Sequence, residues 1–209
     1  MIAAISLMRR RHDAPVTQFR RHWLDVHGPL VCRFSGIRRY VQCHVVASPV
    51  SNAAAREMAI DGFPILFFDN DDDRRQAQRS PEMALCNVDS RDFVGAVSRV
   101  TADVEDVVPL TPEQQRISVI ALTLPGQDGT AEALRRLPRL RGLIRYHVRK
   151  QGAAANSTIA HLSVTVGDVA QAWFDGLVDL EEALAGWNMP EVGLFVVEAH
   201  WLVSRVQPL

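Results

Sequence analysis

A histidine and a tyrosine in the first quarter of the chain are the residues whose types and spacing best fit a chemical role. His27 comes at the end of an amphipathic helical segment, and Tyr40 lies on the strand predicted to follow it. An imidazole exchanges protons near neutral pH, and a phenol donates a hydrogen bond to a carbonyl or lactone oxygen. Placed together beside an apolar cavity, the two predict proton transfer on a small molecule, with both as catalytic residues.

The helix that carries His27 also carries His22, five residues earlier. His27 precedes Gly28, where we expect the helix to end, so the helix dipole would favour the protonated ring and help it act as an acid. The alternative is a histidine that only caps the last carbonyls of a helix. In a regular helix the two histidines point about 140° apart, so we do not expect them to bind one metal ion.

The strand predicted over residues 37–46 has one polar and one apolar face. Tyr40, Gln42 and His44 share the polar face. If helices cover the apolar face, the polar face looks into a barrel and contacts the ligand; the alternative is a polar face exposed to solvent. The predicted substrate-binding residues are His22, Trp23, Gln42, His44 and Phe67.

The composition is that of a folded, core-forming protein, with 47% hydrophobic and 22% charged residues. Lys and Arg total 23 and Asp and Glu 24, a net charge of -1 that does not supply the basic surface nucleic acid requires. No apolar stretch reaches the length of a membrane span. Three cysteines without CxxC spacing argue against a disulfide framework or a zinc site. We expect a cytoplasmic protein without a nucleic-acid or membrane partner.

Three aspartates resemble the start of a calcium loop, namely Asp69, Asp71 and Asp73. Arg74 stands where such a loop needs glycine, and Ser80 where it needs glutamate. We therefore predict no calcium site and place these carboxylates at the N-terminus of a helix.

Two halves of the chain follow one plan, with a boundary at the prolines of residues 109–112. The predicted order is strand, helix, two strands, helix, strand in each half. In residues 1–110 these elements are 2–9, 16–27, 37–46, 62–68, 71–85 and a strand within 97–108. In residues 111–209 they are 117–124, 131–140, 142–148, 159–166, 169–184 and 192–203. The segments 36–40 and 142–146 occupy matching places.

An antiparallel sheet with both helices on one face leaves its other face bare. Two such sheets closing face to face bury both bare faces. We therefore predict an α+β fold in which two ferredoxin-like βαββαβ halves form a dimeric α+β barrel within one chain, with helices outside and a cavity inside.

Residues 19–30 and 38–42, supported by 61–69 and 80–93, resemble the EthD family over about residues 1–110. The resemblance implies the same barrel, here with its halves in tandem, and a place in small-molecule degradation. Lactone isomerases of similar fold use a histidine and a tyrosine at positions that correspond to His27 and Tyr40. In the second half, residues 137–141 take the place of His27 without a histidine, which favours one site per chain.

Three functions remain open. The leading one is cofactor-free proton transfer on an apolar oxygenated compound of the lactone, phenol or ether type, with His27 as acid or base and Tyr40 as donor. The second is a non-catalytic accessory protein that holds such a compound for an oxidase. The third is a haem- or oxygen-using oxidoreductase. We expect no metal, and either a monomeric pseudo-dimer or a homodimer.

Overall fold

Eight antiparallel strands close into a barrel in the computed structural model, which describes residues 1–110, 116–127, 129–153 and 158–204. The strands are β1 (Ile2–Arg10), β2 (Ile37–Val45), β3 (Gly62–Phe68), β4 (Val94–Val108), β5 (Ile117–Thr123), β6 (Gly142–Gly152), β8 (Asp168–Phe174) and β9 (Gly193–Ser204). Their order is β1-β3-β2-β9-β5-β8-β6-β4, and β4 returns to β1. A short strand, β7 (Ala160–His161), pairs with β4 in parallel.

Each half contributes four strands in the ferredoxin-like order. The first half runs β4-β1-β3-β2 and the second runs β6-β8-β5-β9. The halves meet where β2 pairs with β9 and where β4 pairs with β6. The predicted fold class is therefore confirmed.

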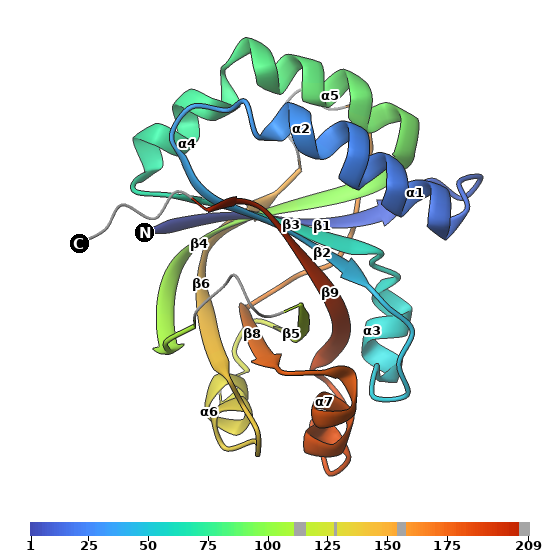
Figure 1. Ribbon diagram of the computed structural model, residues 1–209, viewed down its shortest axis with the longest axis vertical. Coiled ribbons are helices and arrows are strands. Elements are labelled where there is room, and N and C mark those ends of the chain that lie inside the picture. The colour runs from blue at the N-terminus through green and yellow to red at the C-terminus, as the bar shows by residue number, and fades with distance from the viewer. Residues whose placement is uncertain (111–115, 128, 154–157, 205–209) are drawn as a thin grey trace.

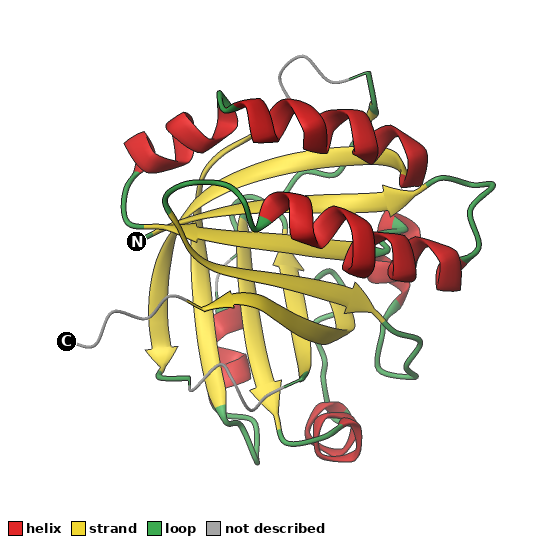
Figure 2. Cartoon of the chain, turned by 45° about the horizontal axis from the view of Figure 1, so that its top comes forward, coloured by secondary structure: helices red, strands yellow, loops and turns green. Residues whose placement is uncertain are grey.

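Helices cover the outside of the barrel on two opposite sides (Figure 1). One side carries α1 (Val16–His22), the π-helical turn η1 (Trp23–His27), α2 (Gly28–Val31), α4 (Asp71–Gln78) and α5 (Pro81–Phe93). The other carries α6 (Thr130–Arg135) and α7 (Leu177–Leu184), and α3 (Ala53–Met58) lies beside β9. Figure 2 shows the α1–α2 rod and the α4–α5 pair lying side by side over the strands of the first half. No helix in the described part of the chain has the length and apolar character needed to cross a membrane.

The inside of the barrel is packed with apolar side chains, so the expected internal cavity is wrong. Val41 and Cys43 of β2 point into this core, together with Phe63 and Phe67 of β3. The polar face of β2 points outward to the helices instead. The reason is that the sheets of both halves bury their apolar faces against each other inside the barrel. The polar face of β2 therefore lies on the outside of the sheet.

The helix predicted to end at Gly28 and Pro29 continues to Val31. Gly28 keeps right-handed helical angles, φ -53° and ψ -51°, and its N–H donates to the carbonyl of Trp23, five residues back. A proline ring clashes with the carbonyl four residues earlier in a regular helix, and the wider π turn relieves that clash. Because glycine has no Cβ, Gly28 tolerates the helical conformation before a proline better than other residues do.

Several predicted boundaries also differ from the structure. Residues 168–174 form β8 rather than the start of a helix, because both faces of this strand are buried and no alternation marks it. The strand predicted over 159–166 is reduced to the two residues of β7. The helix predicted over 71–85 is two helices, divided before Pro81. The short helix α3 was not predicted.

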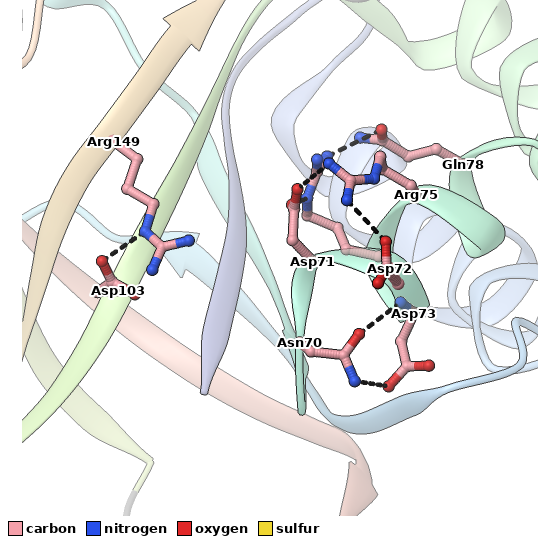
Figure 3. A network of polar contacts seen from close by, with 9 residues as sticks. Asn70, Asp71, Asp72, Asp73, Arg75, Gln78, Asp103 and Arg149 are labelled. Carbon is pink, nitrogen blue, oxygen red and sulfur yellow. Dashed lines mark hydrogen bonds and ion pairs between the residues drawn. The ribbon is translucent and has the colours of Figure 1, made fainter.

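Of the aspartates that resemble a calcium loop, Asp71 and Asp73 lie in the first turn of α4, as expected, whereas Asp69 precedes the helix and pairs with Arg38. Asn70 caps this helix by accepting a hydrogen bond from the Asp73 N–H at 2.9 Å (Figure 3). Arg75 donates to the carboxylates of Asp71 and Asp72 at 2.5 and 2.7 Å. Negative charge in a first helical turn is stabilised by the helix dipole, so these residues have a structural explanation.

Candidate functional site

A cavity of about 110 Å³ lies between the outer face of the first-half sheet and the helices that cover it. Its wall is mainly apolar, and its polar side chains come from the helical rod, from α4 and α5, and from β1, β2 and β4. The apolar residues include Met8, Val31, Phe34, Leu66, Phe68 and Met83, and the polar ones include His27, Tyr40, Ser90, Arg99 and Thr101. A mostly apolar pocket with a few convergent polar groups is the usual form of a small-molecule site.

A partly buried carboxylate holds both histidines of the helical rod. The Nδ1 atom of His27 lies 2.7 Å from Asp89 Oδ2, and the Nε2 atom of His22 lies 2.9 Å from Asp89 Oδ1. Phe93, one turn further along α5, packs against both imidazole rings with centroids 5.0 Å apart. The helix α5 therefore positions both rings from the side.

The π turn explains how two histidines five residues apart meet one carboxylate. A regular helix would separate them by about 140°, which was the expectation from the sequence. The wider turn between them reduces this angle, so both rings point toward α5. The carboxylate oxygens are taken up by the rings, and no cluster of three or more His, Cys, Asp or Glu side chains within the described ranges is arranged to hold a metal ion.

The electrostatics of Asp89 determine which nitrogen of His27 carries a proton. Burial raises the pKa of Asp89, but hydrogen bonds from His27 and His22 outweigh burial and lower it. An ionised carboxylate only accepts hydrogen bonds, so the Nδ1 atom of His27 donates, and in the neutral ring the Nε2 atom carries the lone pair. The helix does not end at Gly28, as the expected role of the helix dipole assumed, because four helical residues follow His27.

Tyr40 lines the same cavity from β2. Its hydroxyl oxygen accepts a hydrogen bond from Gln42 Nε2 at 2.9 Å, and the same amide donates to the Trp23 carbonyl at 2.8 Å. Burial raises the pKa of Tyr40 and outweighs the hydrogen bond from Gln42. The phenol therefore stays protonated and keeps its own proton available for donation.

Trp23, Gln42 and His44 form a buried support behind this wall rather than part of it. His44 stacks on Trp23 with ring centroids 4.3 Å apart, and its Nε2 atom donates to Gln42 Oε1 at 3.0 Å. Burial lowers the pKa of His44 to about 3, so the ring is neutral. Through Gln42, these three side chains hold the Trp23 carbonyl in the π turn and orient the Tyr40 hydroxyl.

Of the seven residues predicted from the sequence, His27 and Tyr40 line the cavity. His22 reaches the site through Asp89, and Trp23, Gln42 and His44 support it from behind. Phe67 lies on the opposite face of its strand, inside the barrel, where its ring is 6.2 Å from that of Tyr146.

Sequence reasoning missed Asp89 and Arg99. Asp89 lies three residues after Cys86 and four before Phe93, both of which are buried. This spacing places Asp89 on the apolar face of the helix, where a carboxylate needs a hydrogen-bonding or charged partner. The spacing could therefore have indicated a functional residue.

In the described part of the second half, apolar side chains fill the space between helices and sheet. Leu134 of α6 and Leu180 and Leu184 of α7 pack directly on the outer face of β5 and β8. The described residues thus combine an α+β barrel with a partly buried histidine–carboxylate pair beside an apolar cavity.

Comparison with known proteins agrees with the α+β barrel fold. Residues 11–96, within the first half of the chain, match the EthD domain. No curated protein matches the sequence.

The whole fold is similar to solved structures of low sequence identity. An anthrone oxidase-like protein aligns with 98% of this chain and 94% of its own, at 10% identity and a TM-score of 0.63. A Lactobacillus acidophilus NCFM protein, provisionally named a monooxygenase, aligns with 98% and 96%, at 7% identity and a TM-score of 0.56. An EthD family protein of Bacillus halodurans C-125 aligns with 49% of this chain and 97% of its own, at 21% identity and a TM-score of 0.42.

Proposed function

We propose that the first-half cavity binds a small apolar oxygenated compound and that His27 transfers a proton on it without a cofactor. The observation that carries the proposal is the 2.7 Å contact between His27 and Asp89 on the wall of an apolar cavity. A carboxylate on one ring nitrogen orients the imidazole and stabilises the charge that forms when the other nitrogen takes a proton.

The step is a proton abstraction next to a carbonyl group. The Nε2 atom of His27 takes a proton from carbon, and the C–H electron pair moves into the carbonyl to give an enolate oxygen. Tyr40 donates its hydroxyl proton as a hydrogen bond to that oxygen. Returning the proton to another carbon of the enolate shifts a double bond, so the reaction balances without an oxidant.

The EthD domain and the fold of the neighbours support a role in small-molecule chemistry. The name of the anthrone oxidase-like neighbour suggests a useful probe, since the methylene group of anthrone is made acidic by its ketone and rings. A second probe is α-angelica lactone, in which loss of a proton and its return to another carbon moves the double bond into conjugation.

The test is solvent exchange. Both probes are incubated in D₂O with the wild-type protein, and deuterium incorporation is followed by NMR. We expect wild type to exceed buffer, and His27→Gln to lose most of the excess, by roughly a hundredfold or more. The exposed histidine His161 provides a matched control, because His161→Gln should exchange as wild type does.

Equal rates for wild type and His27→Gln, or no exchange above buffer, would overturn the proposal. Binding of the probes to wild type without exchange would instead assign the cavity to a carrier that holds such compounds for another enzyme.

A further inference from the structure

An arginine without a carboxylate partner lies on the wall of the cavity. Arg99 is on the outer face of β4, opposite Ser6 of β1 in the sheet, and both line the cavity. The hydrogen bond found for its guanidinium is a long one, 3.5 Å from Nη2 to Asn87 Oδ1. Within the described ranges, no carboxylate lies within ion-pair distance of Arg99.

The other charged groups around the cavity are already paired. Arg74, on the same wall, contacts Asp71 at 2.5 Å. Asp89 is held by its two histidines. Among the described residues that line the cavity, none is an aspartate or a glutamate. Arg99 therefore places on the cavity wall a positive charge that no carboxylate of the described residues neutralises.

An uncompensated guanidinium inside a protein is costly. A guanidinium is charged at all ordinary pH values, and Arg99 is partly buried, so its charge loses part of its hydration without gaining a carboxylate partner. Burial lowers the pKa of Arg99, which reflects the same cost. A ligand with a carboxylate would supply the missing negative charge. A planar carboxylate also accepts two parallel hydrogen bonds from one arginine side chain.

We infer that Arg99 binds a carboxylate of the ligand, so the cavity takes a small apolar acid. This inference rests on the proposed function for the site and names its substrate class. The apolar wall holds the body of the molecule, Arg99 holds its carboxylate, and His27 faces the rest of it. The carboxylate thereby orients the molecule relative to the proton-transfer residue.

Calorimetric titration with a matched pair of probes tests the inference. Phenylacetate and phenylacetamide have nearly the same shape, and only the first carries a charge. We expect wild type to bind phenylacetate about tenfold to a hundredfold more tightly than phenylacetamide, and Arg99→Met to lose this preference. Arg99→Lys should retain part of it. Arg149→Met, outside the cavity on the adjacent strand, should retain all of it.

Thermal unfolding of the empty proteins separates binding from a structural role. Removing a partly buried charge that has no carboxylate partner should leave the melting temperature of Arg99→Met equal to or above that of wild type. A lower melting temperature would indicate that Arg99 supports the fold, and would overturn the inference. An equal affinity of wild type for the acid and the amide, including no binding of either, would also overturn it.

The two proposals fail separately. His27→Gln should keep the preference for phenylacetate while losing solvent exchange, whereas Arg99→Met should lose the preference. A protein that prefers the acid and shows no exchange keeps the binding inference and refutes proton transfer.

Discussion

The neutral, buried His44 predicts a specific loss of stability in mild acid. Its ring is 2% exposed, stacked on Trp23 and hydrogen-bonded to Gln42. Burial is the main reason that its pKa falls from the ordinary value of 6.5 to about 3, and the charges of His200 and Arg20 lower it further. Between these two pH values the unfolded chain binds a proton at this position and the folded chain does not.

The sign and the size follow from proton linkage. Because the unfolded state binds more protons, the free energy of unfolding falls as the pH falls below 6.5, until the folded ring is protonated near pH 3. Over the interval from pH 7 to pH 5, the two pKa values correspond to a loss of about 2 kcal/mol from His44 alone.

The assay is urea unfolding at both pH values, with tryptophan fluorescence as the signal. His44→Phe keeps an aromatic ring against Trp23 and cannot titrate, so its loss should be smaller than that of wild type by about 2 kcal/mol. The exposed-site variant His161→Gln should lose as much as wild type. If wild type and His44→Phe lose stability equally between pH 7 and pH 5, the reasoning from burial is refuted.

Three further predictions follow from the geometry of the site. Gly62→Ala would place a Cβ 2.4 Å from the Trp23 ring, so the free energy of unfolding measured in urea should fall by about 1–3 kcal/mol. An unchanged free energy of unfolding would contradict this packing. Asp89→Asn should slow solvent exchange by roughly tenfold or more, because an amide no longer fixes the His27 tautomer in which Nδ1 carries the proton. NMR exchange rates equal to those of wild type would contradict a role for the His27–Asp89 contact. Burial raises the pKa of Cys86 to about 12, so iodoacetamide should label it slowly at pH 8 until urea is added, as peptide mass spectrometry would show.

The sequence allowed the two faces of β2 to be distinguished but not assigned to layers. Alternation showed that Tyr40 and Gln42 lie on the face opposite Val41. It did not show which face the helices cover, because that depends on the other half of the barrel. The apolar face is buried inside by strands distant in sequence, and the polar face finds its hydrogen-bond partners in the π turn.

The histidine–carboxylate pair was only half predictable for a related reason. His27 was identified from its position on the helix, but Asp89 is 62 residues away along the chain. Their contact depends on the π turn, and Gly28 and Pro29 were interpreted as the end of the helix rather than as the cause of a wider turn. A local distortion of one residue thus decides which side chains of the rod meet α5.

The closure of the barrel within a single polypeptide has a consequence for how sites can differ. In a symmetric dimer of identical subunits, each substitution occurs in both subunits, so a substitution that fills one pocket also fills the equivalent pocket of the other subunit. Here the pairings β2–β9 and β4–β6 join unlike partners. The leucines of α6 and α7 can therefore pack tightly against the sheet of the second half, while a cavity remains between the helices and the sheet of the first half. Because the two halves are joined in one chain and differ in sequence, a substitution that improves packing in one layer does not also occur in the layer that contains the cavity.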